Sequence, residues 1–462
     1  MGPCGVGLAA GVRVADMITK TLRNWKRLAR RMTRRMFAAM PSAWRFGLYR
    51  RAIDFAPAHA STLELKIADT QEELEQCLAL LHDAYVASGF MQPHPSGLRV
   101  TPYHALPTTT TLCAKVDGQV VGTLSIVREG VFGFPMQTAF DISSVRAKEG
   151  RIAEISALAI HPRYRKTGGS VLFPLMKFMY EYCTKYFDTR HLLIAVNPNH
   201  IEMYESLLFF RRLTADGVDR YDFANGAPAV GATLDLQEAP QLFERAYAGK
   251  PGRRNLHRFF VETKLPAIRF PDRPWHTSND PVLTPALLHH FFVVRTPGFA
   301  ELDARKRHLL HSIYPDPEWA SVLPELEAAP CTGTALRQYP RFSLKCPAVF
   351  TTDANAVNAF SGAIIEVSAC GFQARTRHAL NPGERVCAQV ELGQGVESSI
   401  VARVVRQVSD DAEMVYGFAI DQSDLTWQHC VAWLDAAADT AASKVEPAAL
   451  AVAQKAPELS VA

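Results

Sequence analysis

The chain has 462 residues, a formal net charge of +4, 48% hydrophobic residues and 21% charged residues, which suits a soluble globular protein of two to three domains. Its nine cysteines are scattered and odd in number, and none forms a Cys-x-x-Cys pair, which argues against a disulfide framework and against a zinc site. We therefore expect no metal, and a reducing cytoplasm as the location.

The first 60 residues contain a strongly basic segment. Within one run without acidic residues stand Lys20, Arg23, Lys26, Arg27, Arg30, Arg31, Arg34 and Arg35. Apolar residues recur through this run at steps of three and four, which predicts a basic amphipathic helix. It is too charged to span a bilayer and lacks the apolar core of a cleavable signal. We expect it to lie on an anionic membrane surface; docking on the next domain or contact with nucleic acid are the alternatives, and no nucleic-acid fold follows it.

Four elements are predicted next. A strand at 63–67 precedes a helix at 71–87, whose apolar residues share one face. The stretches 111–116 and 119–127 then flank Asp117-Gly118, a strong signal for a tight hairpin. The sequence thus predicts two antiparallel strands after a strand and a helix.

The stretch 152–160 is an apolar strand that carries Glu154 and ends before Pro162, because proline cannot continue a strand ladder. A turn follows and opens a helix over 171–182. Its candidate ligand-binding residues are Arg165, Lys166, Gly168, Gly169 and Ser170. Glycine lets a ligand approach the backbone and a helix N-terminus carries roughly half a positive charge, so the turn predicts a phosphate site.

A strand at 191–196 and a helix that begins near Asn197 and carries Tyr204 complete the order β-α-β-β-β-α-β-α. This order and the Arg165-x-x-Gly168-x-Ser170 turn resemble the GNAT-type N-acyltransferases, with Ser170 where glycine or alanine is usual. The segment Asn197-Pro-x-His200-x-x-x-Tyr204 resembles more specifically the N-acyl amino acid synthase family. Glu154-x-Ser156 resembles the Glu-x-Ser of the related acyl-homoserine lactone synthases, although Ala157 replaces their next arginine. The resemblance implies an α/β GNAT-type domain over residues 61–240.

Such an enzyme needs a base and an acid. An amino acid's amine is mostly protonated at neutral pH, and the departing thiolate gains from a proton donor. Glu154 is the candidate base, directly or through a water; a solvent-exposed strand end is the alternative, but its apolar neighbours favour burial. The resemblance makes Tyr204 the candidate acid, whereas composition fits a tyrosine packed on a helix face equally well.

The candidate catalytic set also includes Ser156 and His200. His200 would orient a substrate carboxylate or, alternatively, cap its own helix. The family resemblance further implies that backbone amides of residues 158–160 polarise the thioester carbonyl at a splayed strand.

The sequence of residues 241–330 predicts a mainly helical extension, which several prolines interrupt. Similar extensions occur in the N-acyl amino acid synthase family, so this one would wall a channel for a long acyl chain, or simply pack on the sheet. The adjacent His289-His290 do not have metal spacing, because helical ligands face together at three or four residues.

Two short motifs near the C-terminus resemble those of the PilZ domain. They are Arg337-x-x-x-Arg341 and Glu366-x-Ser368-x-x-Gly371, each entering a predicted strand. In that family such elements bind cyclic di-GMP, and planar guanidinium groups suit this ligand because they stack on guanine and bond phosphate. Glu366 stands where Asp or Asn is usual, and its extra methylene moves the acceptor outward by ~1.5 Å.

Strands at 385–392, 399–405 and 414–420 predict that this motif pair belongs to a small all-β PilZ barrel over residues 331–436. A helix at 425–436 would close it, and the Ala-rich tail 437–462 is expected to be disordered.

The combined hypothesis is a bacterial N-acyl amino acid synthase under cyclic di-GMP control, peripheral on the inner face of the cytoplasmic membrane. The resemblance implies acyl carrier protein as the acyl donor, although a pantetheine-phosphate site would accept coenzyme A equally well. A free amino acid is the expected acceptor. The alternatives are a catalytically idle GNAT scaffold that acts as a cyclic di-GMP effector, and a homoserine-lactone-like signal synthase.

Overall fold

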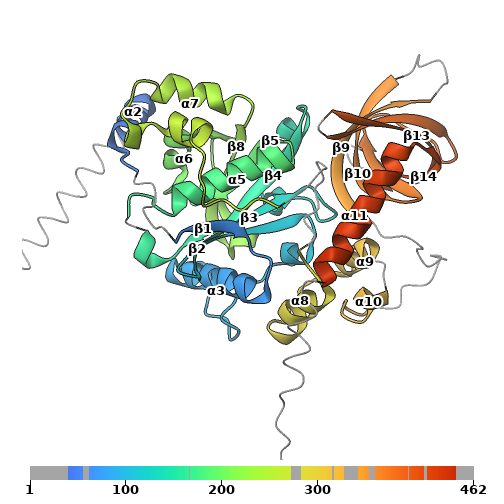
Figure 1. Cartoon of the computed structure of the whole chain (residues 1–462), viewed down its shortest axis with the longest axis horizontal. Coiled ribbons are helices and arrows are strands. Elements are labelled where there is room, and N and C mark those ends of the chain that lie inside the picture. Colours follow the sequence, from blue (N-terminus) through green and yellow to red (C-terminus); the bar gives the residue numbers. More distant parts are fainter. Residues whose placement is uncertain are drawn as a thin grey trace, which may run out of the picture.

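A computed structural model describes residues 40–55, 62–165, 167–271, 282–314, 317–326, 342–352, 359–393, 395–409 and 414–443. Within these residues the chain forms an α/β domain and a separate β-barrel, which lie side by side in Figure 1. The expected basic helix at the N-terminus, Lys166, Arg337 and Arg341 lie outside the described residues.

One eight-stranded sheet carries the α/β domain, in the order β1-β2-β3-β4-β5-β8-β6, with β7 paired to β8. All neighbours are antiparallel except β4 and β5, which are parallel. The strands are β1 (Glu64–Ile67), β2 (Thr109–Val116), β3 (Gln119–Arg128), β4 (Arg151–Ile160), β5 (Thr189–Val196), β6 (Arg211–Arg212), β7 (Val218–Tyr221) and β8 (Ala227–Asp235).

Helices cover both faces of this sheet. The longer ones are α2 (Ser42–Ala52), α3 (Gln71–Ala87), α5 (Leu172–Tyr186), α6 (Ile201–Leu208) and α7 (Ala239–Tyr247), and the short ones near the site are η1 (Pro102–Ala105), η2 (Pro135–Thr138), α4 (Ser143–Arg146), η3 (Pro162–Tyr164) and η4 (Asp222–Ala224). Helix α5 packs on the face that presents Leu112 and Ala114, whereas α3 packs on the face that presents Cys113. Successive side chains of β2 therefore point to the two different helix layers. The predicted order of elements is confirmed.

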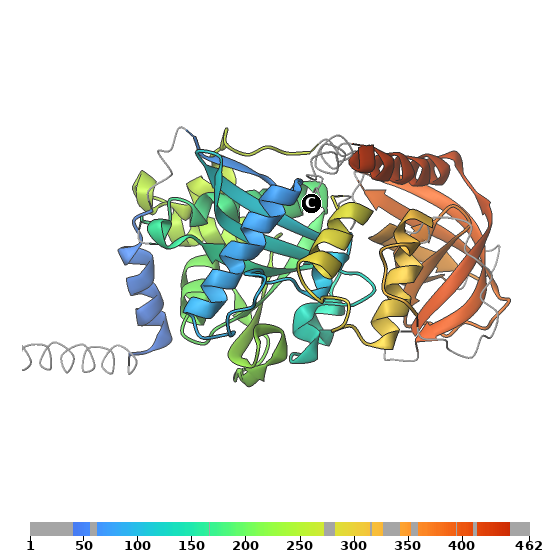
Figure 2. The ribbon, with the colours of Figure 1, turned by 90° about the horizontal axis from the view of Figure 1, so that it is seen from below.

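The described part of the extension after β8 is mainly helical. It contains η5 (Gly252–Arg254), the π-helical η6 (Arg258–Glu262) and η7 (His290–Val294), α8 (Pro285–His289), α9 (Ala304–Ile313) and α10 (Pro317–Ala320). Phe291, Leu310 and Trp319 pack with Leu78 and Leu106 of the α/β domain into one hydrophobic cluster. Figure 2 shows α8 and α9 beside the sheet, on the side of the barrel.

The C-terminal domain is a closed antiparallel barrel of six strands in the order β10-β11-β14-β13-β12-β9. Its strands are β9 (Phe342–Thr351), β10 (Ala359–Ser368), β11 (Gly371–Thr376), β12 (Arg385–Gly393), β13 (Val396–Ser409) and β14 (Met414–Ser423). Helix α11 (Leu425–Ser443) closes it, with Trp427 and Val431 in the barrel core. The helix runs beyond residue 436 into the stretch expected to be disordered, because alanine is the best helix former.

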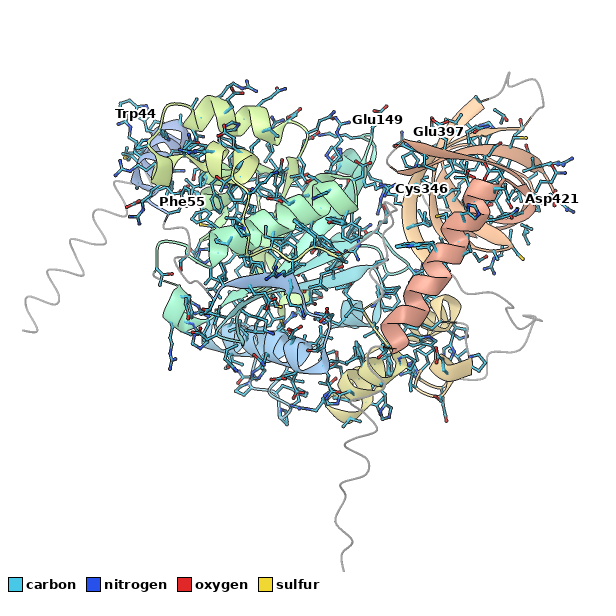
Figure 3. The ribbon with its side chains drawn as sticks, viewed as in Figure 1. Trp44, Phe55, Glu149, Cys346, Glu397 and Asp421 are labelled. Carbon is cyan, nitrogen blue, oxygen red and sulfur yellow. The ribbon has the colours of Figure 1, made fainter. Side chains whose placement is uncertain are left out.

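A buried ionic cluster joins the two domains. Glu129, which follows β3 and is 2% exposed, forms ion pairs with Arg146 of α4, Lys345 of β9 and Arg375 of β11. Three cations hold the pKa of its carboxyl well below the usual range although burial acts in the opposite direction. Beside this cluster a cleft of about 1190 Å³ lies between the domains, and Figure 3 shows Glu149 and Cys346 at their facing edges.

Candidate active site

Glu154 is a buried acid of the α/β domain. Its side chain is 1% exposed and lies on the face opposite α5, where its neighbours on β4 and β5 are Ile152 and Leu193. Its Oε2 accepts a hydrogen bond of 2.9 Å from the backbone N–H of Met136 in η2. Burial raises the pKa of the carboxyl to about 8, and the Met136 bond opposes this shift only in part. Such a carboxyl exchanges protons near neutral pH, as a general base must.

Two tyrosines that the sequence analysis did not single out lie near Glu154. Burial first, and then the Glu154 charge, raises the pKa of Tyr103 in η1 and of Tyr221 at the end of β7. The Tyr221 hydroxyl is buried and has no hydrogen-bond partner among the described residues. No local sequence signal marks these tyrosines, because tertiary folding alone brings them to β4.

Strands β4 and β5 separate next to Glu154. Their parallel pairing ends at Ile155 and Ile194, although β4 continues to Ile160. Ala157 adopts φ 53°, and the register with β3 shifts between Thr123 and Ser125. This bulge leaves the β5 side of residues 156–160 outside the β4–β5 ladder. The structure therefore contains the splayed strand that the family resemblance implied, with Ser156 at its start.

The glycine turn lies beyond the splay, at the N-terminus of the 15-residue helix α5. Gly168 and Gly169 have positive φ, and a Cβ on Gly169 would lie 2.3 Å from the Phe173 ring, so only glycine fits. Arg165 is exposed and its Nε donates to the Ile160 carbonyl at 2.8 Å. The hydroxyl of Ser170 lies 2.5 Å from that of Thr167 and so belongs to the turn itself.

Tyr204 and His200 lie on the α5 side of the sheet. Tyr204 of α6 packs edge-on against Phe210, 5.9 Å between ring centroids, and burial raises its pKa to about 12. His200 is exposed at the N-cap of α6, where its backbone N–H donates to Asn197. Glu154 lies on the opposite face, so the structure places the candidate base and the candidate acid on either side of the sheet.

The expected nucleotide-binding residues are partly described. Ser368 and Gly371 form the β10–β11 turn, in which Ser368 Oγ donates to the Gly371 carbonyl at 3.0 Å. A Cβ on Gly371 would lie 2.5 Å from the Phe418 carbonyl oxygen, so this position requires glycine. Glu366 is buried after a register shift in β10, and its Oε1 accepts from Gln373 at 3.4 Å.

The described residues contain no cluster of three His, Cys, Asp or Glu that could hold a metal ion. Among the helices of this described part, none is long and apolar enough to cross a membrane.

Comparisons with known proteins assign both domains. Residues 76–235 match the family model of the N-acyl amino acid synthase FeeM, and residues 335–435 match that of the PilZ domain. No curated protein matches the chain.

Similar solved structures each cover part of this chain. FeeM, an N-acyl amino acid synthase from uncultured soil microbes, is 21% identical over 39% of this chain and 93% of its own, with a TM-score of 0.33. The acyl-homoserine lactone synthase LasI is 18% identical over 38% of this chain and 93% of its own, with a TM-score of 0.30. The PilZ domain of YcgR from Escherichia coli with cyclic di-GMP is 19% identical over 26% and 98%, with a TM-score of 0.18.

Residues 76–235 thus form an N-acyltransferase domain of the FeeM N-acyl amino acid synthase family, and residues 335–435 form a PilZ domain.

Proposed function

We propose that the protein transfers a long-chain acyl group from a carrier-protein or coenzyme A thioester to the amine of an amino acid, under control of cyclic di-GMP. The observation that carries this proposal is the buried Glu154, whose pKa is raised to about 8 at the point where β4 and β5 separate. A base at this place meets an amine that enters from one face and a thioester that enters through the gap from the other.

The reaction begins when Glu154 accepts a proton from the ammonium, directly or through a water. The free amine attacks the thioester carbonyl, whose developing negative charge is stabilised by backbone N–H groups of residues 158–160. The C–S bond then breaks, and Tyr204 donates its proton to the leaving thiolate from the α5 side. The attacking nitrogen releases its second proton to solvent, and Tyr204 takes up a proton from solvent, so the amide and the thiol leave neutral and Tyr204 is restored. The turn around Gly168 and Gly169 holds the pantetheine phosphate, and its α5 dipole favours that charge.

A small apolar cavity of about 40 Å³ offers a place for the first few carbons of the acyl chain, and the rest of a long chain would require the lining side chains to move apart. It is lined by Met176 and Met179 of α5, Leu208 of α6, and Phe243 and Phe260 of the extension. The cavity lies on the α5 side of the sheet, as do Tyr204 and the phosphate turn. An acidic carrier protein would meet exposed Arg163, Arg165 and Arg211 close to that turn and to α6.

Mass spectrometry of lipids from cells that express the whole chain tests the reaction, with Glu154→Gln as the matched control. New long-chain N-acyl amino acids should appear only with the intact chain. Full activity in a folded Glu154→Gln variant would remove the base assignment. Acyl-homoserine lactones in the extract would instead favour the signal-synthase alternative.

Control by cyclic di-GMP is the second part of the proposal and rests on the PilZ domain. Calorimetry of the full chain should show nucleotide binding, and replacing both Arg337 and Arg341 by alanine should abolish it. Undiminished binding by the double variant would end this assignment. If nucleotide binding persists but the intact chain acylates nothing, the idle-scaffold alternative is favoured.

An anionic membrane surface is the partner we propose for the N-terminal part. Helix α2 exposes Trp44 and Leu48, at 71% and 41%, on the same face as exposed Arg51, and Figure 3 shows Trp44 at the end of the molecule far from the barrel. Sedimentation should show more binding to vesicles with anionic lipid than to neutral ones. Trp44→Ser with Leu48→Ser should weaken it, unlike Val405→Ser at an exposed barrel position; equal binding to both vesicle types contradicts the idea.

A further inference from the structure

The α/β domain contains a buried cation that the proposed chemistry has not yet used. Arg99, in the segment after α3, is 6% exposed, and its backbone N–H donates to the Leu78 carbonyl at 3.1 Å. Its guanidinium lies over the Tyr85 ring at 4.1 Å and the Phe223 ring at 5.2 Å. The Nη2 atom donates to the Phe223 carbonyl at 2.5 Å. Backbone and aromatic contacts thus fix the plane of the group.

Two nitrogens of this guanidinium, Nε and Nη1, are buried without a hydrogen-bond partner among the described residues. A buried arginine is normally paired, because an unsatisfied charged donor is strongly destabilising in a low-dielectric interior. Glu301 is the described carboxylate whose charge raises the pKa of Arg99, and its side chain is exposed to solvent. The nearby His104 does not compete, because burial and then the Arg99 charge lower its pKa to about 4 and keep it neutral.

Tyr221 connects Arg99 to the candidate base. Its pKa is raised by burial and by the Glu154 charge, and lowered by the Arg99 charge, so both groups act on one phenol. The Tyr221 hydroxyl also has no hydrogen-bond partner within the described part of the chain. The Phe223 ring contacts both the Arg99 guanidinium and the Tyr221 ring, with 5.9 Å between the two ring centroids. Tyr221 also packs in one cluster with Ile152 and Leu193, the neighbours of Glu154. The unsatisfied donors of Arg99 and Tyr221 therefore share one buried region with the Glu154 carboxyl.

We infer that Arg99, assisted by Tyr221, binds the carboxylate of the acceptor amino acid and so orients its amine toward Glu154. This inference rests on the proposed acylation and names the feature of the acceptor that the enzyme selects. A carboxylate accepts hydrogen bonds from either edge of a planar guanidinium and neutralises its charge. Arg99 then takes the role that the sequence assigned to His200, which is exposed on the other side of the sheet.

The test compares two acceptors of the purified full chain: the amino acid found in the lipid extracts and its α-carboxamide. Because the two amines differ in basicity, the informative quantity is the change in the ratio of their kcat/KM values between variants. Arg99→Gln should lower this ratio roughly 10- to 100-fold, the range for a lost hydrogen bond to a charged group. The KM for the acyl donor should stay the same. Arg220→Gln, at an exposed arginine next to Tyr221 in the sequence, should leave the ratio unchanged.

Several outcomes would overturn the assignment. In one such outcome, Arg99→Gln lowers the kcat/KM of both acceptors equally, as a purely structural role demands. In another, Arg99→Gln leaves the ratio of the two kcat/KM values unchanged, while His200→Ala lowers it. If Arg99→Gln does not fold, Arg99→Lys keeps the charge without the planar group and should lower the ratio at least threefold; an unchanged ratio then rejects the role. Failure of the proposed function gives a different result, since the unaltered chain would acylate neither acceptor.

Discussion

At the residue scale, Glu154, the proposed base, carries a cost in stability. The pKa of its carboxyl rises from 4.5 to about 8 on folding, so between these pH values the folded protein holds a proton that the unfolded chain releases. Stability must therefore fall as pH rises through this window, by at most about 1.4 kcal/mol per pH unit. Below pH 4.5 the cost is absent, and above pH 8 it is complete.

Glu154→Gln should remove this dependence. At pH 9 we expect the free energy of unfolding of the variant to exceed that of the unaltered protein by a few kcal/mol. At pH 4 the carboxyl is mostly protonated in both the folded and the unfolded state, so its loss should remove little charge effect. Urea denaturation at pH 4, 7 and 9 measures the difference in the free energy of unfolding. A difference that is independent of pH would show that the carboxyl titrates normally. Infrared spectroscopy gives a second measure, since the protonated-carboxyl band should disappear near pH 8 in the unaltered protein only.

At the element scale, the proposed reaction takes place where β4 and β5 separate, with the proposed acceptor side at Glu154 and the proposed donor side at α5, α6 and α7. Ala239, the first residue of α7, is buried and lines the apolar cavity. Ala239→Leu should fill it and shift the N-acyl products toward shorter chains, at a cost of about 1–3 kcal/mol in stability. Chain lengths are read by mass spectrometry, with exposed Ala248→Leu as the control. An unchanged distribution would place the acyl chain elsewhere.

The elements also show how far the sequence could predict the site. The Asp117-Gly118 hairpin, the glycine turn and the burial of Glu154 follow from local signals, because turn residues and apolar neighbours act over a few positions. Arg99 and Tyr221 have no such signal: Arg99 lies in a loop and Tyr221 ends the short strand β7, and neither segment has hydrophobic periodicity. The structure brings them together because β7 pairs with β8 and η4 places Phe223 against Arg99.

At the scale of the whole molecule, the Glu129 cluster holds the barrel on the α/β domain. Arg146 and Lys345 lie 2.9 and 3.3 Å from its carboxylate, and Arg375 also pairs with it. Glu129→Gln leaves these cations close together and uncompensated, so we expect a loss of about 3–5 kcal/mol. Calorimetry should show the barrel and the α/β domain melting separately in the variant. A single unaltered transition would contradict a stabilising role.

Because the Glu129 carboxyl is charged, the stability of the same interface depends on pH. Its pKa is lowered in the folded protein, so its stabilisation is present above the unfolded pKa near 4.5 and is lost as pH falls through the folded value. Glu129→Gln should abolish this loss. The test measures the free energy of unfolding of the unaltered protein and of Glu129→Gln at pH 7 and at pH 3. The difference between the two proteins should be smaller at pH 3.

The position of Glu129, directly after β3, would make the two proposed ligands of this protein thermodynamic partners. Val127, two residues earlier on β3, is the register partner of Glu154 on β4, while Lys345 and Arg375 belong to the barrel. If the nucleotide changes the affinity for the amino acid through this junction, linkage requires the amino acid to change the nucleotide affinity by the same factor. The concentration of acceptor amino acid would then set the threshold at which the protein responds to cyclic di-GMP.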